Sequence, residues 1–237
     1  MYRLKQVLMK FVYCSILSKK KKDKFKSKYL YVMNPDNKIL QILPDGREEV
    51  LKHRIKGLQV LFEGKNNVLK IYDEKVKNVK VTFHGDNSTA VVRDNTICSL
   101  RSNCFYSIDK TSYTNDVKIW LDDDNAQVKI GKNCAISWDI EFMAADCHTI
   151  LDEAGNICNM PKPIEIKDHV WIGCGVKICK GVTIAENNII GMGSVVTKSF
   201  SETNCVIAGN PAKIVKHNVN WDVKMIKDYV ASYSQKK

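Results

Sequence analysis

One aliphatic residue recurs at every sixth position between residues 165 and 198, and this period is the strongest constraint on the fold. An amphipathic helix repeats its apolar face with a period of about 3.6 and a half-buried strand repeats at every second position, so a strict period of six is typical of neither. A long edge strand or an irregular sheet is also disfavoured, because six aliphatic residues stay in register. The row comprises Ile166, Ile172, Ile178, Ile184, Ile190 and Val196.

Smaller or turn-compatible residues occupy fixed offsets from this row. The row two positions earlier comprises Ile164, Val170, Val176, Val182, Asn188 and Ser194, and the positions just after the aliphatic row include Gly173, Ala185, Gly191 and Thr197. Short strands joined by tight corners are typical of a hexapeptide β-helix, in which each coil buries its apolar row only against its neighbours. We therefore expect an all-β chain built around such a coil.

The stretches before the repeat are β-like but less regular. Residues 60–71 and 81–92 align at an offset of 21, each with a Phe, a Gly and an Asn-containing corner, and residues 128–140 restore the step of six. A Pro-Asp-Gly turn between two apolar runs predicts a small hairpin. The expected segments are a basic helical segment at 1–33, a hairpin lead-in at 34–56, the coil domain at 57–215 and a partly helical tail at 216–237.

The positive charge is concentrated near the N-terminus. The chain carries a net charge of +11; residues 1–56 hold 15 Lys and Arg against 5 Asp and Glu, whereas the rest of the chain holds 22 against 21. Apolar residues within 1–17 are spaced as one face of a helix. Lys5 and Lys10 interrupt this run, which is too short to span a bilayer and lacks a signal-peptide cleavage site, so we expect a cytoplasmic protein.

Three roles stay open for the basic segment. It could dock on the coil with its lysines in solvent, lie on an anionic membrane surface such as the inner membrane face, or attract an acidic glycan. Nucleic acid is not expected as a partner, because no nucleic-acid-binding motif accompanies the charge. The nine cysteines, none in a CxxC spacing, favour reduced and partly buried thiols over a disulfide framework or a zinc site, so we expect no metal.

One segment without the six-residue register interrupts the coil. Residues 149–163 contain Gly, Asn and two Pro, and we expect an extended loop of the kind that carries function on a rigid frame. His148 stands at its base, three hexads before Ile166, which predicts a position one coil below that residue. A lone histidine ordinarily has no catalytic role, and we apply that interpretation to the other four, His53, His84, His169 and His217.

Three motifs carry a resemblance to a known family. They are D-C-H-T-I-L-D at residues 146–152, the hexads at 163–198 and V-I-A-G-N-P-A-K-I-V-K at 206–216. Together they resemble the hexapeptide-repeat acyltransferases related to galactoside and serine acetyltransferases, and especially the bacterial capsular polysaccharide O-acetyltransferases of the sialic-acid capsule type. The resemblance is strong over about residues 125–220 and weakest over the basic N-terminus.

The resemblance implies a left-handed parallel β-helix that assembles as a homotrimer, with acetyl-CoA as co-substrate in a groove between neighbouring subunits. It also implies that His148 is the general base and that Asp146 orients or polarises its imidazole. Trp171 would shape the acceptor and thioester site. The residues that the resemblance places in the acetyl-CoA site are Gly173, Gly191, Thr197, Lys198, Ala208, Gly209, Pro211 and Lys213.

These residue types suit acyl transfer to a hydroxyl. Imidazole, whose ordinary pKa is about 6.5, can accept the proton of a hydroxyl as the oxygen attacks. Backbone N–H groups of the Gly-containing corner at 172–175 would stabilise the oxyanion, and Lys198 and Lys213 would meet the CoA phosphates as point charges.

We therefore expect an acetyl-CoA-dependent O-acetyltransferase that acts on a bacterial surface or capsular glycan. An amino-sugar N-acetyltransferase on the same scaffold and a noncatalytic β-helix binding module remain alternatives. A carbonic anhydrase of the β-helix type is disfavoured, because His148 and His169 are off register for a set of three zinc histidines. The glycan, the hydroxyl that is acetylated and the acidity of the acceptor stay open.

Overall fold

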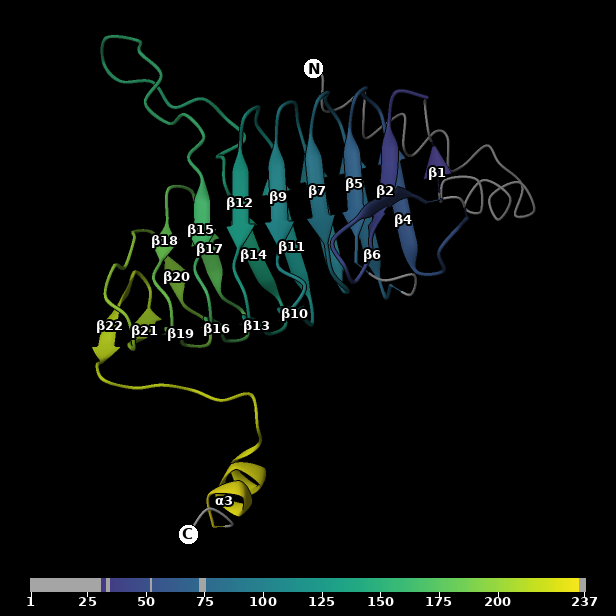
Figure 1. Cartoon of the computed structure of the whole chain (residues 1–237). Helices are drawn as coiled ribbons and strands as arrows, with labels where there is room; N and C mark the ends of the chain where they lie inside the picture. The colour runs from purple at the N-terminus through teal and green to yellow at the C-terminus, as the bar shows by residue number, and fades with distance from the viewer. Residues whose placement is uncertain (1–30, 33–34, 52, 73–75, 235–237) are drawn as a thin grey trace, which may run out of the picture.

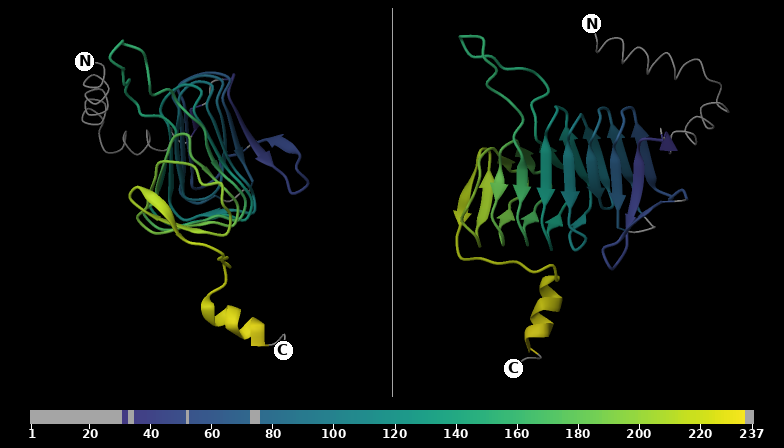
Figure 2. Two further views of the ribbon diagram at one scale, coloured as in Figure 1. Left: turned by 90° about the vertical axis from the view of Figure 1, so that its left-hand side faces the viewer. Right: turned by 45° about the horizontal axis from the view of Figure 1, so that its top comes forward.

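The chain winds into a three-sided parallel β-helix, whose triangular cross-section is visible along its axis (Figure 1; Figure 2, left). The computed structural model describes residues 31–234, except 33–34, 52 and 73–75. Three sheets form the sides. Among the described strands, the pairs are parallel except for two antiparallel hairpins, β2 with β3 and β21 with β22.

The strands of each sheet follow in spatial order. Sheet A contains β1 (Tyr31–Val32), β4 (Leu58–Phe62), β6 (Val79–Phe83), β8 (Thr96–Leu100), β11 (Val117–Leu121), β14 (Ile140–Met143), β17 (Lys177–Cys179) and β20 (Val195–Val196). Sheet B contains β3 (Glu48–Val50), β2 (Lys38–Ile42), β5 (Val68–Ile71), β7 (Thr89–Val92), β9 (Phe105–Ile108), β12 (Gln127–Ile130), β15 (Ile164–Ile166) and β18 (Thr183–Ile184). Sheet C contains β10 (Tyr113–Thr114), β13 (Ala135–Ile136), β16 (Trp171–Ile172), β19 (Ile189–Ile190), β21 (Val206–Gly209) and β22 (Ala212–Lys216).

The aliphatic row of the sequence is divided among the three sheets, because one coil takes three hexads. The register partners are Ile166 with Ile184 in sheet B, Ile172 with Ile190 in sheet C, and Ile178 with Val196 in sheet A. All six side chains are buried. The period of six therefore places one inward aliphatic side chain on each side of every coil.

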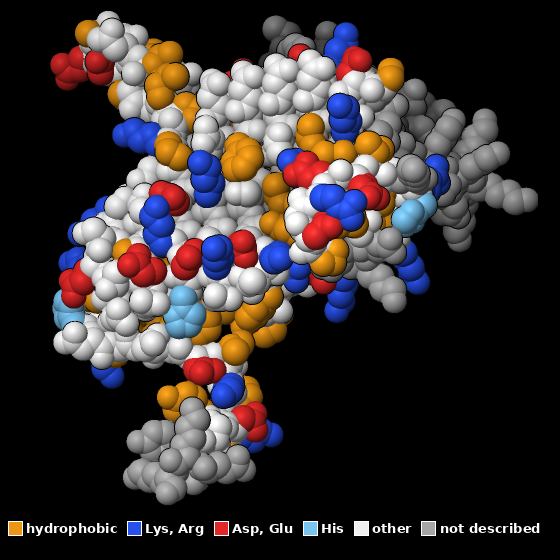
Figure 3. All heavy atoms as spheres, viewed as in Figure 1, with side chains coloured by type: hydrophobic (Ala, Val, Ile, Leu, Met, Phe, Trp, Pro, Cys, Tyr) orange, Lys and Arg blue, Asp and Glu red, His pale blue; other side chains and the backbone are white. Residues whose placement is uncertain are grey.

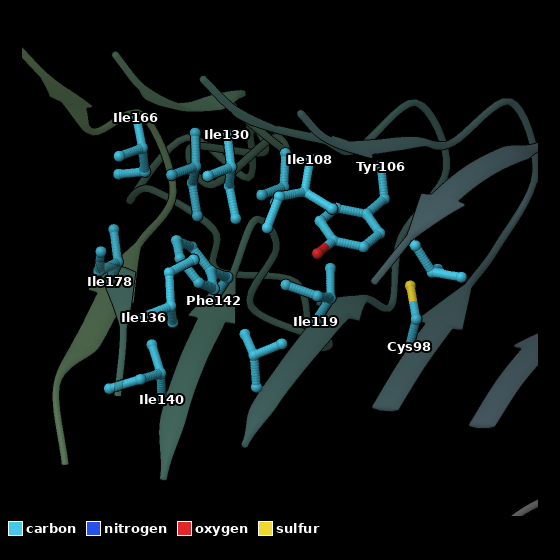
Figure 4. Close-up of a cluster of buried hydrophobic side chains, with 14 of the residues drawn as sticks. Cys98, Tyr106, Ile108, Ile119, Ile130, Ile136, Ile140, Phe142, Ile166 and Ile178 are labelled. Atoms are coloured by element: carbon cyan, nitrogen blue, oxygen red, sulfur yellow. The ribbon is translucent and has the colours of Figure 1, made fainter. Parts of the chain in front are cut away.

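Large side chains fill the interior of the coil. Tyr106, Phe83 and Phe142 are the bulkiest fully buried residues. Tyr106 and Phe142 lie among isoleucines (Figure 4). Full burial of an aliphatic or Phe side chain contributes about 1.5–3 kcal/mol relative to leaving it exposed. Because each coil presents only a narrow apolar strip, this gain accumulates through the contact of one coil with the next.

Asparagine forms many of the corners, because the chain there adopts the left-handed backbone conformation that asparagine tolerates. Asn66, Asn87 and Asn103 have φ angles of 56°, 60° and 55°. Their side chains form a ladder along one corner, in which the Asn66 amide donates to the Asn87 oxygen at 3.2 Å and the Asn87 amide donates to the Asn103 oxygen at 3.4 Å. The ladder aligns successive corners of the less regular N-terminal coils.

The ends of the chain depart from the coil in different ways. The hairpin expected within residues 34–56 contains β2 and β3, but β2 also pairs with β5, so it belongs to the side of the coil. The expected C-terminal helix is α3 (Ile226–Ser234), which stands apart from the coil in both ribbon figures. The basic helical segment expected at 1–33 lies almost wholly outside the described residues. No helix in the described part of the chain has the length and apolar character needed to cross a bilayer.

Candidate active site

The segment at 149–163, hereafter the arm, is a two-stranded ribbon. Leu151 and Ile157 form an antiparallel bridge, and the Asp152 N–H donates to the Asn156 carbonyl at 2.9 Å. The arm leaves the coil between β14 and β15, at the corner between sheets A and B, and points away from it (Figure 1). This geometry brings the two ends of the arm together at the surface of the coil.

A polar cluster closes the base of the arm. Lys180, from the corner between β17 and β18, forms an ion pair with the Asp146 carboxylate and donates to the Asn159 carbonyl at 2.7 Å. The Asn159 side-chain amide donates to the Asp146 carboxylate at 3.0 Å and to the His148 carbonyl at 2.7 Å. The Lys180 ammonium, aided by Asn159, holds the pKa of Asp146 below its ordinary value. Asp146 is therefore a carboxylate at neutral pH, and it is neutralised by a lysine of the following coil.

His148 is exposed at this base, and its imidazole makes no hydrogen bond to the described residues. The Asp146 carboxylate is occupied by Lys180 and Asn159, so it contacts the chain around His148 and not the imidazole. The expected orienting contact between the two side chains is absent from this arrangement. What fixes His148 is instead the hydrogen bond from Asn159 to its carbonyl.

The expected position of His148 one coil below Ile166 is wrong. The strand residue that pairs with Ile166 from the coil below is Ile130, and His148 lies between the two in the sequence. The arm lengthens this coil, so counting back by three hexads across it misplaces every residue between β14 and β15. His148 consequently lies at a corner and not along sheet B.

Lysines occupy the same corner of three consecutive coils. Lys162 lies at the end of the arm, just before β15, Lys180 follows β17 and Lys198 follows β20, at intervals of three hexads. Lys180 is paired with Asp146, whereas Lys162 and Lys198 are exposed. Thr197 and Lys198 therefore lie along the same corner as the base of the arm.

Lys198 also shares a hollow with Lys213 at the C-terminal end of the coil. Its lining comprises Lys198, Ser199, Phe200, Ser201, Glu202, Lys213 and Ile214. The Lys198 ammonium lies 5.7 Å from the centre of the Phe200 ring. The structure thus brings together two lysines that the sequence assigned to CoA phosphates, although β21 separates them along the chain.

The small residues of the expected cofactor site form a second ridge, at the C-terminal ends of the strands in sheet C. Gly173 and Gly191 lie in register on successive coils, whereas the residue in register with Gly191 on the next coil is Ala208, so Gly209 lies one position further along. A Cβ atom added to Gly191 would lie 2.9 Å from the Cβ of Ala208, so close packing of successive coils requires glycine there. Ala208 and Gly209 end β21, and Pro211 follows in the turn to β22.

The corner at 172–175 offers fewer oxyanion donors than expected. The Gly173 N–H already donates to the Ile190 carbonyl at 2.8 Å, and the Gly175 N–H donates to the Trp138 carbonyl at 2.9 Å. Both bonds belong to the packing of the coils. These two amides are therefore not available to a substrate without breaking a coil contact.

Trp171 begins β16 on sheet C and is about two-fifths exposed, at 41%. Trp221, from the segment before α3, lies beside it at 6.0 Å between ring centres and stacks on His169 at 4.4 Å. The Trp221 indole N–H also donates to the His169 carbonyl at 2.9 Å. Sheet C lies across the coil from the arm (Figure 1; Figure 2), so one chain does not bring Trp171 and His148 together.

One group of possible metal ligands occurs among the described residues. A ligand atom from each of Glu202, Cys205 and His217 lies within 4.8 Å of the others. The His217 Nδ1 atom is 2.5 Å from the Glu202 carboxylate, which is a direct hydrogen-bonding distance. Glu202 and His217 thus contact each other directly, and an ion could enter only if that contact opened.

Comparison with known proteins places this architecture in a family. The model of the bacterial transferase hexapeptide family, of six repeats, matches residues 163–198. The polysialic acid O-acetyltransferase of Neisseria meningitidis is 36% identical over 174 residues, which span 70% of this chain and 80% of that protein. The chain belongs to the hexapeptide-repeat acetyltransferases. The resemblance read from the D-x-H, hexad and A-G-N-P motifs is thereby confirmed.

Relatives and solved structures bear out the same family. The polysialic acid O-acetyltransferase of Escherichia coli O1:K1 is 37% identical over 99 residues, but that match spans 41% of this chain and only 32% of the relative. Two solved structures superpose over most of the chain. The polySia specific acetyltransferase NeuO has a TM-score of 0.67 at 28% identity, with 85% of this chain and 94% of that chain covered. The polysialic acid O-acetyltransferase OatWY has a TM-score of 0.63 at 28% identity, with 84% and 97% covered. The expected left-handed parallel β-helix of the family is confirmed.

Three residues of the site were not predicted by the sequence analysis. The position of Lys180 could have been predicted, because it lies three hexads before Lys198 and therefore at the same corner. Nothing in the sequence indicated Asn159, because asparagine is common in polar loops and its partners depend on how the arm folds back. Trp221 lies beyond the repeat, and only the path of the C-terminal segment places it on His169.

Proposed function

We propose that this protein transfers an acetyl group from acetyl-CoA to a hydroxyl of a bacterial surface or capsular glycan. The observation that carries the proposal is the alignment with the meningococcal polysialic acid O-acetyltransferase over 80% of that enzyme, together with the D-x-H motif at the base of the arm. An acidic glycan is the acceptor class favoured by the relatives, whose names specify polysialic acid.

His148 is the proposed general base. Its imidazole would take the proton of the acceptor hydroxyl while the oxygen attacks the thioester carbonyl carbon. The bond from that carbon to the CoA sulfur then breaks, and the imidazolium returns its proton to the departing thiolate. The exposure of His148 beside a rigid coil supports this role, because the base must reach a substrate that enters from solvent.

Lys198 and Lys213 are the proposed partners of the CoA phosphates. Their shared hollow is open to solvent and positively charged, which suits a phosphorylated arm that lies along the surface. Thr197, Gly173, Gly191, Ala208, Gly209 and Pro211 are the other residues that we propose for acetyl-CoA. The glycine positions would let the arm of CoA approach the backbone closely.

A homotrimer is the proposed working form. His148 lies at the corner between sheets A and B, whereas Trp171 and the glycine ridge lie on sheet C, so a site that uses both sets needs two subunits. The arm supports this assembly, because Ile150, Leu151, Ile157 and Met160 are each 55–60% exposed on it (Figure 3, upper left). Apolar surface of this kind is typically covered by a partner. We place the reaction in the cytoplasm, where the basic segment at 1–33 would approach the inner membrane face.

The test is acetyl transfer from labelled acetyl-CoA to sialylated, uronic and neutral glycans and to an amino sugar. We expect transfer to a hydroxyl of a sialylated glycan, and we expect His148→Ala to lower kcat by about 10²- to 10⁴-fold while acetyl-CoA binding persists. The matched control is Lys177→Met, which removes a surface lysine from the same coil as the Lys180 corner. If His148→Ala keeps more than a tenth of the wild-type turnover, as an order-of-magnitude threshold, the base is another group.

Transfer to the amine of the amino sugar, with none to hydroxyls, would overturn the choice of acceptor and favour the N-acetyltransferase alternative. Light scattering of the same preparations tests the assembly. A stable and active monomer would show that His148 and Trp171 do not serve one site.

A further inference from the structure

We propose that Lys180 and Asn159 act with Asp146 as a clamp that positions His148 for catalysis through its main chain. The inference rests on the proposed function for the role of His148, but the clamp itself is a structural arrangement that can be tested without the reaction. It assigns positioning roles to two residues that the family motifs do not mark. It also gives Asp146 a role different from contact with the imidazole.

Asn159 connects every part of the clamp. Its side-chain amide has two N–H donors and one acceptor oxygen, and both kinds of group are used. The donors reach the Asp146 carboxylate and the His148 carbonyl, and the oxygen accepts the Ile150 N–H at 2.8 Å. Asn159 thus joins His148 at the base and Ile150 on the outgoing strand of the arm to the returning strand.

Lys180 anchors this unit to the coil. It belongs to the coil that follows the arm, and its ammonium contacts both the Asp146 carboxylate and the Asn159 carbonyl. Its side chain is 18% exposed, less than any other lysine in the ion pairs of the described residues. Hydrogen bonds between charged groups are stronger where water is partly excluded, so this contact holds better than an ordinary surface pair.

The need for a clamp follows from how the arm is built. The arm projects into solvent, and its own strand contacts fix its shape but not its direction. Because the imidazole makes no hydrogen bond within the described residues, the position of the base depends on its backbone. A misplacement of about 1 Å can lower a reaction rate about 10²-fold, so a backbone anchor next to the base has a kinetic effect.

The decisive variant is Lys180→Met, which keeps the length of the side chain and removes the charge. We expect kcat on a short acceptor to fall about 10²-fold, with the KM values for acetyl-CoA and acceptor little changed, because Lys180 pairs with Asp146 and is not one of the proposed acetyl-CoA residues. Lys180→Arg should restore most of kcat, since it keeps the charge. Lys177→Met is the matched control, because it also breaks an ion pair between successive coils, with Glu141, but away from the arm.

Asp146→Asn should lower kcat in the same way, and the double variant with Lys180→Met should be no slower than the slower single variant. Residues that act as one unit show such non-additive losses. Wild-type kcat in Lys180→Met, or a change confined to KM, would overturn the clamp. Additive losses in the double variant would overturn it as well.

Hydrogen exchange of residues 146–160 gives a readout that does not depend on activity. The clamp predicts faster exchange in this segment for Lys180→Met than for wild type or Lys177→Met, at an unchanged melting temperature. If the wild type transfers no acetyl group, the proposed function fails while this comparison still decides the clamp. Equal exchange in the three proteins would overturn the clamp even if the enzyme is active.

Discussion

The N-terminal and C-terminal coils reach the same architecture by different means. Between β4 and β9 the chain alternates between sheets A and B, its sheet A strands start at unequal intervals, at Leu58, Val79 and Thr96, and sheet C begins only at β10. Between β15 and β20 each coil contributes one short strand to each sheet, with a constant step of three hexads. The irregular coils contain aromatic residues and asparagine ladders, whereas the regular coils contain isoleucine, valine and glycine.

The difference shows which interactions can replace an exact repeat. Where the step varies, Phe62 stacks on Phe83 at 4.8 Å between ring centres, and Phe83 continues in register with Leu100. Large side chains can fill a cross-section that changes from coil to coil. Where the step is constant, aliphatic residues of similar size stack in register, as Ile166 does with Ile184 and Ile178 with Val196. Several corners of the regular part contain glycine instead of asparagine in the left-handed conformation, at Gly175, Gly181 and Gly193.

The substitution with the largest expected effect tests the aromatic packing of the irregular coils. Phe83→Ala should lower the free energy of unfolding by about 3–5 kcal/mol, because a buried Phe leaves a cavity that neighbouring coils cannot close. Ile178→Val in the regular coils is the comparison, with an expected loss of about 0.5–1.5 kcal/mol. Chemical denaturation measures both. Similar losses would show that the two parts do not differ in how strongly they depend on single side chains.

A pair of substitutions with smaller expected effects distinguishes the contribution of the asparagine ladder from the cost of backbone strain at a corner. Asn87→Ala and Gly193→Ala both place alanine in the left-handed conformation, at φ angles of 60° and 72°, but only Asn87 has ladder hydrogen bonds to lose. The conformation costs about 1–2 kcal/mol, and each hydrogen bond contributes about 0.5–1.5 kcal/mol. We expect Asn87→Ala to be the more destabilising in denaturation. An equal or larger loss for Gly193→Ala would contradict this expectation and show that backbone strain outweighs the ladder.

The smallest expected effect is that of Glu141 on β14, which lies between the two parts and pairs with a lysine of the coil on either side. Its carboxylate lies 3.4 Å from the Lys118 ammonium on β11 and 3.0 Å from the Lys177 ammonium on β17, and Lys177 is the larger cause of its lowered pKa. Glu141→Gln should cost about 0.2–1 kcal/mol at pH 7. Since the pKa is lower in the folded state, the stabilisation is present above the unfolded value of about 4.3 and is lost as the pH falls through the folded value.

The measurement is the difference in unfolding free energy between wild type and Glu141→Gln from pH 7 to pH 3. This difference should shrink toward zero at the acid end. Glu165→Gln is the control, because Glu165 pairs with Lys167, its neighbour in sequence, and joins no coils. A difference that grows as the pH falls would contradict the sign of the shift.

Much of the fold follows from the sequence because the coil is a local repeat. Three hexads return the chain to the same side, so the period of six specified the burial of Ile166, Ile172 and Ile178 without knowledge of distant contacts. The motifs also indicated the family from sequence alone, because each motif is a short, contiguous stretch of residues. The N-terminal coils could be predicted only as irregular β structure, because the number of residues per coil varies. Their corners also depend on hydrogen-bond ladders between asparagines of successive coils.

The sequence alone determined the coil and the place of the arm, and its resemblance to the family made His148 the candidate base. Only the tertiary structure decided that Asp146 meets Lys180 and that His148 and Trp171 lie on different sides of one chain. The physical reason is that a contact between side chains depends on how the arm folds back and on which coil presents a charge at its corner. A carboxylate is attracted to every nearby cation alike, so its partner is chosen by the geometry of the folded chain.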